Sequence, residues 1–196
     1  MAYNSTTWTT GVSTTSVSSS NLTLYSVFGI GEIDSAGYLA DTHYPLPFTT
    51  NLVGASGTQD NITFGTGTDP ATTFTTAAGY TTDASLLVPM IWYLPDNIYI
   101  DGVTSIEGAS TSNGDTTRMH LFSYTFTSGS TSALTSGTLL AYNSDVTNAG
   151  AEQAYLSTWT VDSPSVEAGK VILAFFESDS INSDYAISVT VKYHLT

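Results

Sequence analysis

Three side chains in this sequence are suited to binding a metal ion or moving a proton near neutral pH, and they are His43, His120 and His194. Only His43 has an acidic residue at a useful spacing, because Asp41 lies two positions before it. Residues two apart on an extended segment point to the same side, so this pair is a candidate site for a divalent metal. An ordinary polar segment is the alternative.

A second candidate metal site is the segment DSINSD at residues 179–184. Asp179, Asn182 and Asp184 supply oxygen ligands of the kind that calcium prefers. The segment lacks the glycine and the terminal glutamate of an EF-hand loop. A solvated loop between two strands is the alternative, and the sequence favours it.

Acidic side chains could also act in pairs, because glycoside hydrolysis needs two carboxyl groups held about 5 to 10 Å apart in a cleft. Most of the candidates adjoin turn residues, where Asp caps backbone N–H groups. The sequence contains no Gly-x-Ser-x-Gly elbow, His-Glu-x-x-His pair, P-loop or dinucleotide-binding glycine pattern. We therefore expect no enzymatic activity, no catalytic residues and no cofactor. The candidate carboxylates are Asp96, Asp101, Glu107, Glu152, Glu177 and Asp179.

Three aromatic residues, Tyr80, Tyr142 and Trp159, lie near the expected ends of loops. Aromatic rings in loops stack on sugar faces, and Asp and Asn bind sugar hydroxyls. These residues make a glycan- or receptor-binding module of a tail fibre or spike the alternative function. Packing of the same rings in a hydrophobic core is the other interpretation.

The charge balance excludes one large class of partners. The chain has 3 Lys and Arg against 17 Asp and Glu, which gives a formal net charge of −14. Binding to DNA or RNA needs basic groups that displace counterions from phosphates, so nucleic acid is excluded as a main ligand. Anionic membrane surfaces are disfavoured for the same reason. The acidity favours solubility and resistance to nonspecific association.

Cysteine is absent, which rules out disulfides and thiolate metal sites. A β protein without disulfides is stabilised by its core, by a bound ion or by oligomerisation. Residues 1–21 have neither a basic start nor an apolar segment, so we expect no secretory signal peptide. Such a chain would leave the cell by lysis, inside a particle, and type I secretion is the alternative.

Alternating and apolar segments predict strands along most of the chain. The last of them is the clearest, with Ile187, Val189 and Val191 on a core face and Ser188, Thr190 and His194 on a solvent face. Residues 85–94 form a continuous apolar run, which predicts a strand buried on both faces and paired with the next. The expected strands start at Leu22 and cover residues 61–64, 85–94, 98–103, 118–127, 137–143, 153–162, 170–177 and 185–195.

This pattern predicts an all-β fold, because no segment has a convincing helical period with caps. Eight or nine short strands indicate an antiparallel two-sheet β-sandwich of the jelly-roll type. Residues 1–20 are rich in Ser and Thr and predict an extended N-terminal arm, with Trp8 as its one large anchor. Simple disorder of this segment is the alternative. Residues 21–196 then form a single β-sandwich domain. The run at residues 71–82 is expected to be a loop.

Four segments resemble β-rich virion structural proteins of marine tailed bacteriophages. They are IDGVTSIEG from Ile100, MHLFSY from Met119, VEAGKVILAFF from Val166 and ISVTVKYHL from Ile187, and the likeness covers roughly residues 86–195. The resemblance implies a jelly-roll or sandwich unit that decorates the phage head or forms a fibre, as a trimer.

We therefore expect a non-enzymatic virion protein, most simply a decoration or cement protein on the phage head. Its expected partners are further copies of itself, as a homotrimer, and the major capsid protein or other virion proteins. Trp8 is the expected interface residue, because one buried Trp contributes a large contact area.

Overall fold

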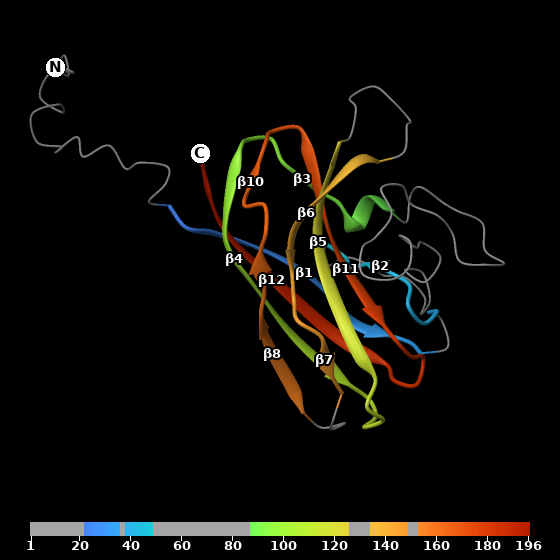
Figure 1. Cartoon of the computed structure of the whole chain (residues 1–196). Coiled ribbons are helices and arrows are strands. Elements are labelled where there is room, and N and C mark those ends of the chain that lie inside the picture. The colour runs from blue at the N-terminus through green and yellow to red at the C-terminus, as the bar shows by residue number, and fades with distance from the viewer. Residues whose placement is uncertain (1–21, 36–37, 49–86, 126–133, 149–152) are drawn as a thin grey trace, which may run out of the picture.

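The computed structural model describes residues 22–35, 38–48, 87–125, 134–148 and 153–196 (Figure 1). The N-terminal arm with Trp8, the strand expected at residues 61–64 and the loop expected at 71–82 lie outside the described residues. Tyr80 and Glu152 lie outside them as well.

The described strands form two sheets in which every pairing is antiparallel. The first sheet has the order β1 (Leu24–Ile33), β12 (Tyr185–Leu195) and β4 (Ile98–Ala109), and β8 (Ala154–Thr158) and β10 (Ser165–Val166) share the far edge of β4. In the second sheet, β2 (Tyr44–Pro45) and β3 (Trp92–Tyr93) pair with β11 (Lys170–Ser178), which is followed by β5 (Thr116–Thr125), β6 (Thr135–Tyr142) and β9 (Thr160–Val161). A further short strand, β7 (Val146–Thr147), pairs with β5.

The order of the strands is that of a jelly roll. If β2 and β3 are taken as one position, the main strands in chain order are β1, β2/β3, β4, β5, β6, β8, β11 and β12. The first sheet then holds β1, β12, β4 and β8, which are the first, eighth, third and sixth of these strands. The second sheet holds β2/β3, β11, β5 and β6, which are the second, seventh, fourth and fifth. This interleaving of two Greek keys across two sheets defines the double-sheet jelly roll. The predicted all-β sandwich is confirmed.

The last strand shows how the sequence builds the core between the sheets. Ile187, Val189 and Val191 are buried there, whereas Ser188 and Lys192 point to solvent, as the alternation predicts. Opposite them, β5 and β11 contribute inward-facing residues such as Leu121 and Phe176. Strand β12 has the bounds that the alternating pattern predicts.

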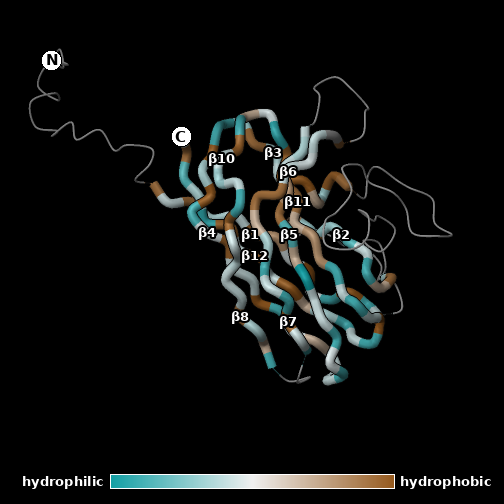
Figure 2. Tube along the Cα trace, viewed as in Figure 1, coloured by the Kyte–Doolittle hydropathy of each residue, from teal (hydrophilic) through white to brown (hydrophobic). Residues whose placement is uncertain are grey.

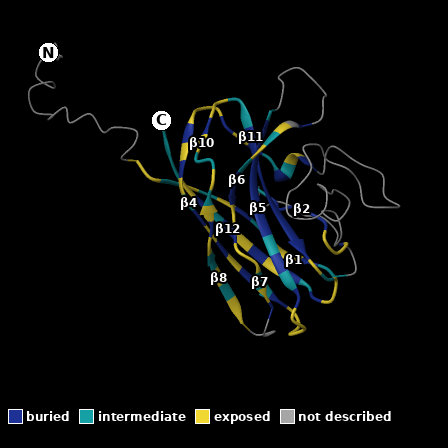
Figure 3. Cartoon of the chain, in the orientation of Figure 1, coloured by how far each residue is buried: buried dark blue, intermediate teal, exposed yellow. Residues whose placement is uncertain are grey.

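The outer face of the second sheet is apolar as well. Phe122 and Tyr124 of β5 and Leu173 and Phe175 of β11 form a second cluster of buried side chains there. Leu87 and Met90 pack onto this cluster. Figure 2 shows hydrophobic residues along β11, and Figure 3 shows β5 and β11 buried over most of their length. The second sheet therefore separates two cores.

The strand predicted at residues 85–94 is wrong. The chain forms the 3-10 helix η4 (Val88–Met90) and then the two-residue strand β3. Pro89 explains the difference, because proline has no N–H to donate to a ladder and fixes its φ angle. The predicted pairing with the next strand is also wrong, since β3 pairs with β11 whereas β4 belongs to the other sheet. Within the described ranges, no helix is long and apolar enough to cross a lipid bilayer.

The single strand predicted at residues 153–162 is divided by Trp159. Strand β8 belongs to the first sheet and β9 to the second, and Trp159 lies between them. Its backbone N–H donates to the carbonyl oxygen of Val103 at 3.0 Å, and its indole N–H donates to Ser105 Oγ at 2.9 Å. Trp159 is buried in the core. It is therefore not a sugar-stacking residue.

Strand β1 continues through two glycines, and one of them is required by packing. A Cβ atom at Gly29 would lie 2.8 Å from the carbonyl oxygen of Ile187 on β12, whereas one at Gly31 would have no neighbour within 4 Å. We expect Gly29→Ala to lower the free energy of unfolding by about 1 to 3 kcal/mol, as overpacking does. Gly31→Ala is the matched control, with little effect. Urea denaturation measures both, and equal midpoints for the two variants would contradict this account.

Candidate functional site

A bulge in β6 turns Tyr142 toward the outer face of the second sheet. Leu121 pairs with Ala141 and Phe122 with Leu139, so Leu140 is an extra residue without a partner on β5. Leu140 and Ala141 both point into the core between the sheets. A bulge re-aims the side chains that flank it, and here Leu139 and Tyr142 both face outward. Tyr142 stays 37% exposed.

The carbonyl group of the bulge also positions Asp162. Leu140 O accepts hydrogen bonds from the N–H groups of Asp162, at 2.8 Å, and of Ser163, at 3.2 Å. The chain that leaves β9 is thereby tied to β6. Asp162 is exposed and lines the same pocket as Tyr142.

Asn143 ends the pairing of β5 with β6. Its N–H donates to Met119 O at 3.2 Å, and its side-chain Oδ1 accepts from the N–H of Met119 at 2.7 Å. Because a backbone N–H can only donate, the second contact fixes which atom of the amide is oxygen. The remaining group, Nδ2, is buried and has no hydrogen-bond partner.

Arg118 and Asp145 form a bidentate ion pair at the end of β5. Arg118 Nε lies 2.6 Å from Oδ1 of Asp145, and Nη2 lies 2.9 Å from Oδ2. The hydrogen bonds from Arg118 lower the pKa of Asp145 below its ordinary value, so Asp145 is charged at neutral pH. Arg118 Nη1 lies 3.7 Å from Oε2 of Glu177.

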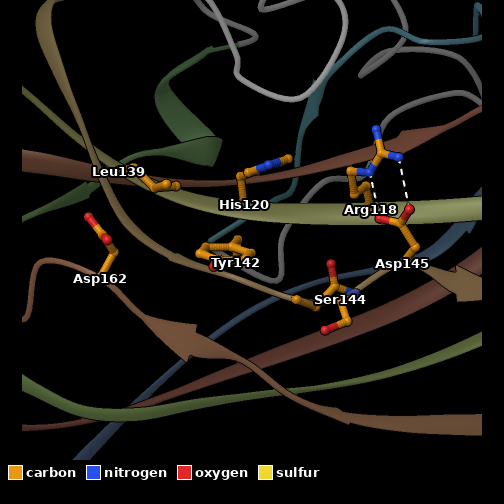
Figure 4. Close-up of a pocket in the computed structure, with 8 residues that line it drawn as sticks. Arg118, His120, Leu139, Tyr142, Ser144, Asp145 and Asp162 are labelled. Carbon is orange, nitrogen blue, oxygen red and sulfur yellow. Dashed lines mark hydrogen bonds and ion pairs between the residues drawn. The ribbon is translucent and has the colours of Figure 1, made fainter.

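These residues line one open pocket of about 560 Å³ on the second sheet. Figure 4 shows Tyr142 and His120 at its centre, with Asp162 at one end and the Arg118–Asp145 pair at the other. Leu139, Asn143 and Ser144 complete the lining. The volume lies within the range of small-molecule sites. The pocket combines an exposed ring, carboxylate acceptors and amide and hydroxyl groups.

One of the pocket's lining residues, His120, belongs to a buried pair of histidines. His120 is directly opposite Tyr142 in the sheet, and its Nδ1 lies 3.1 Å from Nε2 of His43. The same Nε2 lies 3.6 Å from Oε2 of Glu177. Burial, aided by the charge of Arg118, lowers the pKa of His120 to about 4. His120 is therefore neutral at neutral pH.

Burial shifts the pKa of Glu177 in the opposite direction from that of His120, because Glu177 is an acid. Burial raises its pKa to about 7, although the nearby charge of Arg118 acts in the other direction. Asp41, Asp145 and Asp179 add to the rise, because like charges disfavour ionisation. The end of the second sheet thus holds a coupled group of ionisable side chains that the sequence places far apart.

Comparisons with known proteins identify no family. No protein-family model matches the sequence, and no curated protein matches it. Among solved structures, one similar chain is an aminopeptidase from a marine sediment archaeon, Thaumarchaeota archaeon, with a TM-score of 0.38 and 9% sequence identity. The match covers 89% of this chain and 37% of the aminopeptidase chain, so this chain spans well under half of that protein's length. A likeness at this level carries no argument about fold or activity.

The candidate metal pair of Asp41 and His43 does not have the extended geometry that the sequence argument assumes. Asp41 has a φ angle of 54°, so the segment is not extended there. Asp41 is exposed, whereas His43 is fully buried. Among the described residues, no group of three or more His, Asp and Glu side chains is arranged to hold a metal ion.

The three candidate calcium ligands each form a hydrogen bond with another segment of the chain. Asp179 Oδ1 accepts from the N–H of Thr116 at 2.8 Å, and Asp184 Oδ1 accepts from the N–H of Ser35 at 2.8 Å. Asn182 donates to Oδ1 of Asp115 at 3.4 Å. Asp179 and Asp184 thus cap backbone N–H groups of neighbouring segments, which fits the loop between two strands that the sequence favours.

The carboxylates considered for hydrolysis are dispersed over the described part of the chain. Asp101 pairs with His194 at 3.0 Å on the outer face of the first sheet, where His194 also stacks on Tyr99. Glu107 lies in the core between the sheets, and Glu177 lies on the outer face of the second sheet. Asp96 is exposed in the turn before β4. No two of these described candidates share the pocket.

Two pocket residues, Tyr142 and His120, are singled out from the sequence, which does not bring them together. One signal for their neighbours is Arg118, because a lone cation on a largely apolar strand needs an acidic partner. Asp145 and Glu177 are the partners that the fold supplies. Nothing in the local sequence marks Asn143 or Asp162 as members of the same site.

Proposed function

We propose that this chain is a non-enzymatic structural protein of a virion, a decoration or cement protein of a phage head that works as a homotrimer. The jelly roll supports the proposal, since this fold is common in viral capsid domains. The acidic sequence and the resemblance of residues 86–195 to phage virion proteins support it as well. Fold alone does not imply function, so the main support for the proposal is the outer face of the first sheet.

The observation that carries the proposal is the uncharged middle of the outer face of the first sheet. Ile106 of β4 and Leu156 of β8 are direct cross-strand partners, and they are 52% and 74% exposed. Across β12 and β1 the same face continues through Ser188, Thr190 and Val27. None of these side chains is charged, in a chain with 17 Asp and Glu.

An uncharged face suits contact between copies of this chain. Two molecules with a net charge of −14 repel each other unless they meet where charge is absent. Exposed apolar side chains in the middle of that face supply contact area that does not require ion pairs. The arm of residues 1–20, with Trp8, is a second proposed attachment point, to a neighbour or to the capsid shell.

The virion role is tested by mass spectrometry of particles purified from a lysate in which the chain is produced. We expect the chain at a copy number in the hundreds per particle, as for a decoration protein. Tens of copies or fewer would indicate a fibre or spike. Particles without the chain would refute the proposal.

The self-contact is tested by introducing charge into the uncharged face. We expect the double variant Ile106→Asp, Leu156→Asp to dissociate the oligomer, because carboxylates would then be buried between subunits. Ile181→Asp is the matched control, since Ile181 is 50% exposed in the loop before β12. Size-exclusion chromatography with light scattering measures the mass. A wild-type protein that is monomeric at micromolar concentration would contradict the proposal.

A further inference from the structure

We propose that the pocket beside Tyr142 binds an uncharged saccharide, with the ring of Tyr142 as the surface on which a sugar stacks. The pocket lies on the second sheet, whereas the proposed assembly face lies on the first. The proposal therefore adds a binding activity to the structural role, and it does not depend on that role.

The first argument is the buried donor of Asn143. Asn143 lines the pocket and is only 2% exposed, and its side-chain Nδ2 has no hydrogen-bond partner. Leaving a buried amide donor unsatisfied costs about 1 to 3 kcal/mol. The amide cannot simply turn over, because its oxygen is held by the N–H of Met119. Nδ2 is closed to solvent in the free protein, so a ligand with an acceptor oxygen removes that cost if binding opens a path to it.

The second argument is the exposed ring of Tyr142. Its cross-strand partner His120 is buried, yet Tyr142 keeps more than a third of its surface exposed at the pocket. The bulge at Leu140 is what places it there. An aromatic face held on a rigid strand suits the apolar face of a pyranose, because stacking then costs little conformational entropy.

The third argument is the charge of the lining, which selects against anionic ligands. The pocket has two carboxylates, from Asp145 and Asp162, and one guanidinium, from Arg118. Arg118 is already paired with Asp145 and lies near Glu177, so its charge is matched within the protein. His120 adds no positive charge at neutral pH. A sialylated or sulfated sugar would meet net negative charge, whereas sugar hydroxyls can donate to the carboxylates.

A glycan array carrying neutral, sialylated and sulfated oligosaccharides is the first test, using the full chain. We expect binding confined to neutral glycans, and saturation-transfer NMR with the best neutral oligosaccharide should confirm it in solution. Absence of any neutral glycan above background in both experiments would overturn the proposal. Binding confined to sialylated or sulfated glycans would overturn it as well.

Substitutions then locate the site. We expect Tyr142→Ala to weaken binding of that oligosaccharide about tenfold or more, as loss of one stacking ring does. Asp162→Asn should weaken it severalfold and leave the fold intact, since the backbone of residue 162 makes the structural contact. Tyr93→Ala is the matched control, because Tyr93 is 56% exposed at the other edge of the same sheet. Full affinity in Tyr142→Ala, or equal losses in Tyr142→Ala and Tyr93→Ala, would refute the assignment.

Discussion

Replacing Glu107 by glutamine is expected to stabilise the protein by about 3 kcal/mol at pH 8 and to change little at pH 4.5. Glu107 is 3% exposed in the core between the sheets, and burial raises its pKa to about 7 from an ordinary value of 4.5. Thr117 Oγ1 lies 3.0 and 2.9 Å from the two carboxyl oxygens, and its hydrogen bond opposes the rise.

The sign follows from the protons bound in each state. Between pH 4.5 and 7 the folded protein holds a proton on Glu107 that the unfolded chain has lost. Stability from this group is therefore fully present below pH 4.5 and is lost as the pH rises through 7. Glutamine resembles the protonated acid and can still accept from Thr117, so the variant keeps at high pH the stability that the wild type loses.

Thermal unfolding of both proteins between pH 4.5 and 8 measures this difference. For a chain of this size we expect a gain in Tm of roughly 6 to 12 °C at pH 8. Glu167→Gln is the control, because Glu167 is exposed in the turn before β11 and the chemical change is the same. His120 titrates in the opposite sense, so only the difference between variant and wild type isolates Glu107. An equal gain in Glu167→Gln would show that net charge, not burial, is responsible.

How far the fold can be predicted depends on whether a local rule decides each element. The alternation over β12 is decided locally, because one face of that strand meets the core and the other meets water. The division of residues 153–162 into β8 and β9 is not local. It depends on Val103 and Ser105, which accept the two N–H groups of Trp159 from more than 50 residues away.

The candidate site depends even more on contacts between segments that are far apart in the sequence. Tyr142 is recognisable as an aromatic residue near a loop, but the face it occupies is set by the bulge at Leu140. Strict alternation cannot reveal that a single extra residue moves a side chain from one face to the other. Asp162 joins the site only because Leu140 O accepts its N–H. The pocket is a product of strand pairing between distant segments.

Two continuous apolar runs in this chain have different outcomes, although the same rule predicts a doubly buried strand for each. The rule that such a run is buried on both faces fails for residues 85–94, where Pro89 breaks the strand. It holds for β11, where Val171 to Phe176 are all fully buried. Consecutive residues of a strand point to opposite faces, so these side chains serve two different cores.

Phe175 and Phe176 provide the largest expected effect, because they are adjacent, fully buried and directed into different cores. Phe176 packs against Tyr185 and Tyr38 between the sheets, with ring centroids 5.0 and 6.0 Å away. On the outer face, Phe175 lies 6.3 Å from the ring of Phe122. We expect Phe175→Ala and Phe176→Ala each to lower the free energy of unfolding by about 3 to 5 kcal/mol.

A sandwich with one solvated outer face would lose very different amounts of unfolding free energy in the two alanine variants. Urea denaturation followed by circular dichroism measures both, with Phe175→Leu and Phe176→Leu as milder variants in case the alanine proteins do not fold. Tyr25→Ala is the control for an aromatic ring that is exposed on β1. If Phe175→Ala cost less than about 1 kcal/mol while Phe176→Ala cost several, the outer cluster would not be a core. Equal losses would establish that the second sheet is stabilised by packing on both of its faces.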